Sequence, residues 1–241
     1  MINLKDKNIL LIGATGRVGA SIAHTLDALD ANITLIAKDE KRLDTLLSSL
    51  NLKSKHKTLC LDMCDIGLVE GLMKDALSLN VGKFDGLVYA AGVIPIMPIK
   101  NTTFKLLLDT MSVNFFAFVE FVRIFSNRKF HNLNSSIVAL SSFAALSPDK
   151  GQIAYGASKG AMDSAVVAMA KELFKKQIRV NAIRPAIVRS DARLSPRESQ
   201  LAEAMGGTIE PASIAEQVAF LLSDLSSGVY GRCFDVRGYL S

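Results

Sequence analysis

The stretch Asn8-Ile-Leu-Leu-Ile-Gly-Ala-Thr-Gly-Arg-Val-Gly19 decides the fold that we predict for this chain. An apolar run of strand length leads into three glycines, and a helical pattern follows them. Gly13 permits a tight turn, Gly16 lets backbone N–H groups approach a pyrophosphate, and Gly19 lets the helix pack closely on the strand. Phosphates bind well at a helix N-terminus, where N–H groups are free and the dipole is positive. The stretch therefore predicts a dinucleotide-binding turn, and the alternative is a helix start whose glycines serve packing alone.

Apolar runs of strand length alternate with longer segments of helical period along the chain. The runs are continuously apolar, which is typical of parallel strands covered by helices on both faces. We therefore predict one doubly wound, Rossmann-type α/β domain over residues 1–241, with a parallel sheet of about seven strands and helices on both faces. The predicted strands are Lys7–Gly13, Asn32–Ala37, Thr58–Leu61, Phe84–Ala91, Ser136–Ser141, Ile178–Ile183 and Arg232–Val236. The predicted helices are Val18–Leu29, Glu40–Leu50, Ile66–Leu79, Thr103–Phe125, Ala154–Lys175 and Ala212–Leu222.

The order of the elements indicates a division of labour between the two halves of this domain. Residues 1–130 are predicted to bind mainly the dinucleotide, and residues 131–241 to supply the catalytic and substrate half. The polar segment Ala186–Glu210 follows the sixth strand, at the sheet edge where ligands of such folds bind. We predict either a mobile lid or a plain surface loop with a short helix there.

The composition suits a globular protein, since 49% of the 241 residues are apolar and 21% are charged. The net charge is +5, but the basic residues form no stripe with interleaved aromatics, so we expect no nucleic-acid partner. No apolar run approaches the roughly 20 residues that span a bilayer, and the N-terminus lacks an apolar signal region. We expect a soluble cytoplasmic protein with no membrane partner. Three sparse cysteines and three scattered histidines predict neither a disulfide framework nor a metal site.

The end of the second strand, Leu35-Ile-Ala-Lys-Asp39, bears on the choice of dinucleotide. An NAD site normally places a carboxylate here to hold the ribose 2′-OH. Ala37 takes that place and Lys38 follows it, which favours the 2′-phosphate of NADP, and Arg17 adds a second cation. Asp39 would also fit as the carboxylate of an NAD site. We predict NADP(H) as the preferred cofactor and keep NAD(H) as the alternative.

Tyr155 and Lys159 stand four residues apart in a predicted helix, and Ser142 ends the apolar run before them. Positions i and i+4 share one helix face, so the ammonium is expected to lie beside the phenol. A nearby cation favours phenolate, so we expect the pKa of Tyr155 to fall below its reference of about 10. The phenol would then exchange a proton with substrate while Ser142 holds the reacting oxygen. The same pair also occurs by chance on solvated helix faces.

The chain resembles the short-chain dehydrogenase/reductase family over nearly its full length, with the matching segments in the family's order. These segments are Gly13–Gly19, Asp62-Met63, Tyr89-Ala-Ala-Gly92, Asn114, the trio Ser142, Tyr155 and Lys159, Arg179–Pro185 and Gly231–Gly238. Departures from the family's pattern are Ile12 for threonine and Arg17 for glycine in the turn, Tyr89 for asparagine, Ala186 for glycine and Ser190 for threonine.

The resemblance implies a role for each matching residue. Tyr155 would be the acid/base, Lys159 would lower its pKa and hold the nicotinamide ribose, and Ser142 would orient the substrate oxygen. Asn114 would hold a water that links Lys159 to solvent in a proton relay. The residues implied to bind the cofactor are Gly13, Thr15, Gly16, Arg17, Val18, Gly19, Lys38, Asp62, Met63, Ala90, Ala91, Gly92, Asn114, Tyr155, Lys159, Pro185, Val188 and Ser190.

The leading hypothesis is an NAD(P)-dependent oxidoreductase that interconverts a carbonyl and a secondary alcohol by hydride transfer. A sugar-nucleotide epimerase or dehydratase shares the fold and the Gly-x-x-Gly-x-x-Gly spacing, but its substrates bind a C-terminal extension that is not expected here. A non-catalytic dinucleotide-sensing regulator is the other alternative, although such proteins often lose the tyrosine or the lysine. The substrate would be a small carbonyl compound or alcohol, lying against Phe143, Ala144, the Ile94–Ile99 loop and Ala186–Glu210.

The two long helices predicted at Thr103–Phe125 and Ala154–Lys175 bear on assembly. Both are more apolar than packing one face against a sheet requires. Tetramers are common in the family that the chain resembles. We therefore expect these helices to pack against another subunit in a homodimer or homotetramer.

Overall fold

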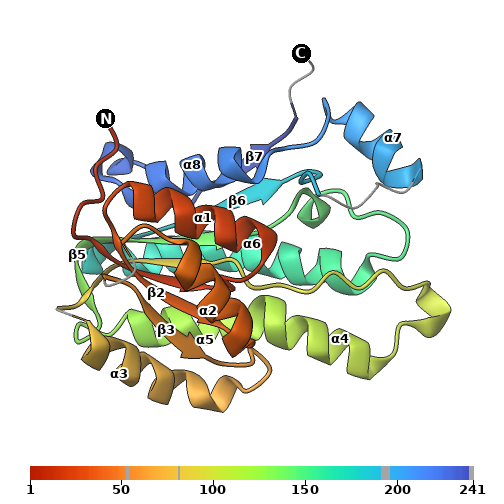
Figure 1. Cartoon of the computed structure of the whole chain (residues 1–241). Helices are drawn as coiled ribbons and strands as arrows, with labels where there is room; N and C mark the ends of the chain where they lie inside the picture. Colours follow the sequence, from red (N-terminus) through yellow and green to blue (C-terminus); the bar gives the residue numbers. More distant parts are fainter. Residues whose placement is uncertain (53–54, 81, 191–195, 239–241) are drawn as a thin grey trace.

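A seven-stranded parallel sheet forms the centre of the molecule (Figure 1). The computed structural model describes residues 1–52, 55–80, 82–190 and 196–238. The strands are arranged in the order β3-β2-β1-β4-β5-β6-β7, and every neighbouring pair is parallel. Their bounds are β1 Asn8–Ile12, β2 Asn32–Ala37, β3 Lys57–Cys60, β4 Phe84–Tyr89, β5 His131–Leu140, β6 Ile178–Pro185 and β7 Cys233–Val236.

Helices cover both faces of this sheet, as the alternation of apolar runs and helical segments predicts. One core contains buried residues of α1, α2 and α8, and the other contains those of α3, α5 and α6. Figure 1 shows α3, α4 and α5 together below the sheet, and α1 beside α8 above it. The helix bounds are α1 Arg17–Ala28, α2 Glu40–Ser49, α3 Val69–Leu79, α4 Phe104–Met111, α5 Ala117–Phe125, α6 Ile153–Leu173, α7 Pro196–Ala204 and α8 Pro211–Leu222.

The continuously apolar strands are explained by these two cores. Successive side chains of a strand point to opposite faces of the sheet. On β1, Leu10 and Ile12 join the core with α3, α5 and α6, whereas Ile9 and Leu11 join the core with α1 and α8. All four side chains are buried, so the sequence of β1 is apolar throughout instead of alternating between apolar and polar residues. The doubly wound fold predicted from the apolar runs is confirmed.

The fifth strand begins five residues earlier than predicted, at His131 rather than Ser136. Its first residues are polar, so they carry no apolar signal, and they pair near the amino edge of the sheet. His131 pairs with Phe84, and Asn132 donates to a carboxylate oxygen of Asp85 at 3.0 Å. The pairing register shifts between Phe84 and Gly86, which marks an irregularity where this polar start joins the apolar strand.

The helix predicted over 103–125 is interrupted, which the sequence does not indicate. A π-helical turn, Ser112–Phe116, separates α4 from α5 and contains Asn114. Such turns insert an extra residue into an α-helix and often occur at functional sites. After β6, the segment 186–210 contains α7, and residues 191–195 of the predicted lid lie outside the described residues. Whether the segment acts as a lid stays a prediction.

The described residues contain no helix that is both long and apolar enough to cross a membrane. Across the same ranges, no three histidine, cysteine, aspartate or glutamate side chains gather as a set of metal ligands. Doubly wound sheets bind their ligands at the carboxyl ends of the strands, so the side chains there are the candidates for a functional site.

Candidate active site

The glycine turn between β1 and α1 has no room for side chains at two of its glycines. Gly13 has a φ of +82°, and a Cβ on it would collide with the backbone of Ala90 and Ala91. A Cβ on Gly19 would collide with the carbonyl oxygen of Gly13. The turn therefore packs against the chain that follows β4, and it brings Gly13 next to Ala90 and Ala91, three of the predicted cofactor residues.

The N-terminus of α1 fits an anionic group. Gly16 is its N-cap and has no side chain to occupy the free N–H groups. The first turn, which starts at Arg17 and Val18, contains no acidic residue. The N–H groups and the positive end of the helix dipole are thus left for a ligand anion, as a pyrophosphate would require.

At the end of β2, Asp39 has a structural contact that sequence reasoning did not predict. One oxygen of its carboxylate caps α2 by accepting from the backbone N–H of Arg42 at 3.1 Å. The Arg42 side chain reaches back to the glycine turn, where it donates to the carbonyl oxygen of Thr15 at 2.6 Å. Arg42 thus adds a second cation near Lys38 at this corner. Sequence reasoning missed Arg42, although its place in the first turn of α2 was a usable signal.

The predicted adenine contact, Asp62-Met63, lies directly after β3. One oxygen of the Asp62 carboxylate accepts from the backbone N–H of Cys64 at 2.9 Å, which fixes the side chain within its own turn. The Met63 side chain is buried and belongs to the core beside α3. The backbone N–H of Leu61 donates to the carbonyl oxygen of Ala37 at 3.0 Å, so this turn lies beside the end of β2.

Tyr155 and Ser142 are brought together at the carboxyl end of β5. Ser142 follows the strand, and its hydroxyl oxygen accepts from the backbone N–H of Ala144 at 3.1 Å. Tyr155 lies in the first turn of α6 and is buried, within range of the Ser142 side chain. Burial raises the pKa of Tyr155, and the Ser142 hydroxyl opposes this only in part. The expected lowering of its pKa is therefore wrong for this state of the protein.

The position of the Lys159 ammonium explains why the pKa of Tyr155 is not lowered as expected. Its ammonium donates to the carbonyl oxygen of Leu140 at 2.7 Å and lies 5.9 Å from the centre of the Tyr155 ring. The side chain is 3% exposed, and burial lowers its pKa to about 8 while Asp163 raises it. The lysine thus shares the helix face of Tyr155, as predicted, but its charge is directed at the end of β5 rather than at the phenol.

Asn114 lies on the other side of this group, fully buried in the π-helical turn. Its side-chain oxygen accepts from the backbone N–H of Val93 at 2.8 Å, and its nitrogen donates to the Val93 carbonyl at 3.0 Å. The nitrogen also donates to the hydroxyl oxygen of Ser158 at 2.9 Å. A Cβ on Gly92 would lie 3.4 Å from the Asn114 side-chain oxygen and 3.5 Å from the Lys159 nitrogen, so both groups face the same small space.

Charged side chains behind Lys159 form a network that sequence reasoning missed. Asp163 lies one helical turn beyond Lys159, and its carboxylate is 3.4 Å from the Arg184 guanidinium, with both side chains about 15% exposed or less. Arg184 also lies 2.7 Å from the Asp235 carboxylate and donates to the Cys233 carbonyl at 2.8 Å. The spacing of Asp163 from Lys159 was a usable signal, but the pairing with Arg184 depends on how α6 packs against β6.

The remaining predicted cofactor residues follow β6. Pro185 is paired with Val236 at the end of β7, and Val188 forms a bridge with Ile209, on the far side of the 186–210 segment. The Arg17 guanidinium donates to the carbonyl oxygen of Arg189 at 3.3 Å, so the glycine turn and the start of this segment are in contact. Ser190, the last of the set, is the next residue along the chain.

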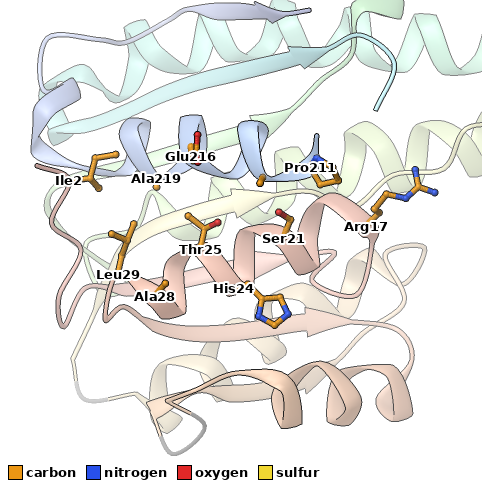
Figure 2. A pocket seen from close by; sticks show the side chains of 11 residues that line it. Ile2, Arg17, Ser21, His24, Thr25, Ala28, Leu29, Pro211, Glu216 and Ala219 are labelled. Carbon is orange, nitrogen blue, oxygen red and sulfur yellow. The ribbon is translucent and has the colours of Figure 1, made fainter. Parts of the chain in front are cut away.

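A hollow of about 680 Å³ lies between α1 and α8, away from Tyr155. Figure 2 shows Arg17 at one end of it and Ile2 and Leu29 at the other, with Ser21, Thr25 and Glu216 between them. Only Arg17 belongs to the predicted site, so this hollow is distinct from the group around Tyr155.

Comparisons with known proteins agree on the family. A family model described as enoyl-(acyl carrier protein) reductase matches residues 13–238. The crystal structure of a short-chain dehydrogenase/reductase from Brucella melitensis has a TM-score of 0.89 to this fold at 28% identity, covering 100% of this chain and 99% of that one. The chain belongs to the short-chain dehydrogenase/reductase family. The family and the fold that the resemblance implied are thus confirmed.

Similar curated members of this family are named as reductases. The 3-oxoacyl-(acyl-carrier-protein) reductase FabG of Rickettsia felis is 28% identical over 247 residues, covering 99% of this chain and 98% of that protein. The L-xylulose reductase of Bos taurus is 29% identical over 245 residues, covering 98% of this chain and 97% of that protein. Both matches extend over essentially the whole chain.

Replacing Asp163 with asparagine is expected to lower the pKa of Lys159 below its present value of about 8, because the carboxylate that raises it is removed. NMR titration of ¹³C-labelled lysine side chains would measure this change. Asp75→Asn, an exposed substitution on α3, is the control and should leave the Lys159 titration where it is. A Lys159 titration that does not move in Asp163→Asn would contradict the assignment.

The lowered pKa of Lys159 also makes the free energy of unfolding depend on pH. The folded-state pKa of Lys159 lies below its ordinary value of 10.5, so between about pH 8 and 10.5 the unfolded chain binds more protons than the folded protein. The contribution of Lys159 to the free energy of unfolding therefore rises with pH across this window. In Asp163→Asn the rise should begin at lower pH, measured by urea unfolding at a series of pH values.

Proposed function

We propose that this protein is an NADP(H)-preferring oxidoreductase that interconverts a carbonyl and a secondary alcohol, with Tyr155 as its acid/base. The observation that carries the proposal is the buried Tyr155 phenol close to the Ser142 hydroxyl, with the Lys159 ammonium on the same helix face at the carboxyl edge of the sheet. The names of the relatives, which are reductases, support the class of reaction.

Tyr155 and Ser142 are suited to act on one oxygen atom. Because burial raises the pKa of Tyr155, the phenol carries its proton at neutral pH and can donate it to a carbonyl oxygen that gains charge. Ser142 is held by the Ala144 N–H, so its hydroxyl can be directed at the same oxygen. The nicotinamide of the bound cofactor supplies or accepts the hydride.

Lys159 and Asn114 are suited to manage the charge that this proton transfer leaves behind. A phenolate formed on Tyr155 would be stabilised by an ammonium 5.9 Å from its ring in a buried site, where the effective dielectric is low. Lys159 and the Asn114 side chain face the same space beside Gly92, so a proton relay through this space would restore the phenol. In this proposal Lys159 also holds the nicotinamide ribose.

The preference for NADP(H) is supported by the end of β2. One oxygen of the Asp39 carboxylate is engaged as the cap of α2, which competes with a role in holding a ribose 2′-OH. Lys38 and Arg42 present cations at this corner, and a 2′-phosphate is the part of NADP that they would bind, while Arg17 adds positive charge at the glycine turn. The pyrophosphate would bind at Gly16–Gly19, and the remaining proposed contacts are those predicted from Asp62 to Ser190.

Tyr155→Phe tests the proposed mechanism. Removing the hydroxyl takes away the proton donor, so turnover of every carbonyl substrate should fall by about 100-fold or more. NADPH binding, measured by its fluorescence, should change little because the ring remains. Tyr230→Phe, at a half-exposed site against Phe174, is the control and should keep full activity.

The outcomes separate the competing functions. A Tyr155→Phe protein with near-full activity would end the proposed mechanism. Wild-type protein that binds NADPH but reduces no member of a broad panel of ketones, aldehydes and 3-oxoacyl thioesters would favour the dinucleotide-sensing alternative.

Lys38→Ala and Arg42→Ala test the cofactor preference. Each substitution removes one cation from the proposed 2′-phosphate site. Each should therefore weaken NADPH binding about 10-fold or more while leaving NADH binding nearly unchanged. Lys41→Ala, an exposed neighbour on the same helix, serves as the matched control. Calorimetric titration with both dinucleotides measures the ratio of their dissociation constants. Equal losses of affinity for NADPH and NADH would show that this corner does not bind the 2′-phosphate.

We propose that the protein assembles through α4 and α6. Exposed apolar side chains lie on these two neighbouring helices and on the π-helical turn between α4 and α5, namely Phe104, Leu108, Phe116, Ile153 and Val167. Phe104 is 77% exposed, which is unusual for so large an apolar side chain. A second copy of the chain is the expected partner, as a homodimer or homotetramer.

Size-exclusion chromatography with light scattering tests the assembly. The wild type should have a mass of two or four chains of 26.0 kDa at micromolar concentration. Phe104→Ser combined with Leu108→Ser should shift it toward one chain, because two apolar anchors of the interface are lost. Leu68→Ser removes an equally exposed side chain elsewhere and should leave the mass unchanged. A wild-type monomer would reject the proposal.

A further inference from the structure

We infer that the hydroxyl of Tyr89 is a positioning group that holds Asn114 in place from beneath the site. Tyr89 is the last residue of β4 and stands where the family usually has asparagine. Its hydroxyl donates a short hydrogen bond to the backbone carbonyl of Val113, the residue directly before Asn114. The catalytic consequence of this contact rests on the proposed function, whereas the positioning itself does not.

The Tyr89 side chain is itself rigidly held. It is fully buried, and its ring packs against Phe118 at 5.5 Å and Phe121 at 6.1 Å between ring centres, both on α5. Such tilted aromatic contacts fix the plane of the ring and leave the hydroxyl one direction in which to point. Burial also raises the pKa of Tyr89, so the hydroxyl stays protonated and remains a donor at neutral pH.

The bond acts at the point where the helix is irregular. The π-helical turn Ser112–Phe116 is wider than an α-helical turn, and its backbone is less regularly paired. A donor from outside the helix that binds the Val113 carbonyl stabilises this wider form over a regular helix. Since Asn114 is the next residue, a return to α-helical geometry would rotate its side chain away from Val93.

Two contacts then clasp the chain after β4 against the π-helical turn. Tyr89 binds Val113 at one end, and the Asn114 amide binds both backbone groups of Val93 at the other, at 2.8 Å and 3.0 Å. The residues between Tyr89 and Val93 are 90–92, the proposed cofactor contacts of this strand end. Gly92 among them borders the space that Lys159 and Asn114 share. The hydroxyl therefore helps to hold one wall of the site.

The clasp continues to the helix that contains the acid/base. The Asn114 amide nitrogen donates to Ser158 at 2.9 Å, and the Ser158 hydroxyl donates to the backbone carbonyl of Tyr155 at 2.7 Å. A line of hydrogen bonds thus joins β4, the π-helical turn and the first turns of α6, with the Tyr89 hydroxyl at its far end. Tyr89 does not touch the reacting groups, so its effect must pass through Asn114.

Tyr89→Phe removes this one hydrogen bond and keeps the ring. Hydrogen exchange of the backbone amides in 112–118 should become at least about 10-fold faster, while exchange in α1 and α8 stays as in the wild type. If the proposed function holds, kcat should fall about 10-fold with little change in the KM for NADPH, since a displacement near 1 Å can cost up to about 100-fold in rate. Tyr230→Phe, which removes a phenol hydroxyl at a half-exposed site, is the matched control and should change neither the exchange over 112–118 nor kcat.

A double mutant isolates the path through Asn114. In an Asn114→Ala background, Tyr89→Phe should cause no further loss of kcat, because the group that it positions is gone. Unchanged exchange over 112–118 in Tyr89→Phe, or an additional kcat loss of the same size in the double mutant, would overturn the inference. If the wild type turns over no carbonyl at all, the proposed function fails, and the exchange measurement alone decides whether Tyr89 positions the turn.

Discussion

The burial of one ammonium group constrains the rest of this structure. Lys159 is 3% exposed, and an isolated charge in such a place costs several kcal/mol. Two groups offset this cost. The Lys159 ammonium donates to the Leu140 carbonyl at 2.7 Å, and the Asp163 carboxylate lies one turn further along α6. The Leu140 carbonyl is within reach only if α6 packs across the end of β5, so the position of the lysine and the docking of the helix are one constraint. Tyr155 and Ser158, on the same helix, are placed by that docking.

The parallel sheet converts this constraint into a site. Because all strands run in one direction, β1, β4, β5 and β6 end at the same edge of the sheet. The residues at or just after the ends of these strands therefore gather at that edge, namely the glycine turn, residues 90–92, Ser142 and Pro185. Asn114, Tyr155 and Lys159 come to this edge from helices instead, Asn114 from an irregular turn and the other two from α6.

The sequence was sufficient for the fold and for the family, but not for the geometry of the predicted site residues. The apolar runs predicted all seven strands, because a strand buried on both faces has no choice of residue type, and the largest error lies at the polar start of β5. The spacing of Tyr155 and Lys159 predicted a shared helix face correctly. The spacing could not show that the Lys159 ammonium binds the Leu140 carbonyl. It also could not show that burial raises the pKa of Tyr155. Asp39 was readable as a helix cap, whereas Arg42 and Asp163 depend on the packing of α2 and α6.

Within the proposed function, the direction of these shifts suits reduction. At neutral pH the phenol of Tyr155 is protonated because burial raises its pKa, and the Lys159 ammonium keeps its proton up to about pH 8. This pair is in the acid form, which is the form that would donate a proton to a carbonyl oxygen during reduction. Oxidation of an alcohol would instead need the phenolate, and here the ammonium that would stabilise it is 5.9 Å from the centre of the ring and bound to Leu140. The proposed acid role of Tyr155 and the position of Lys159 are therefore consistent with each other.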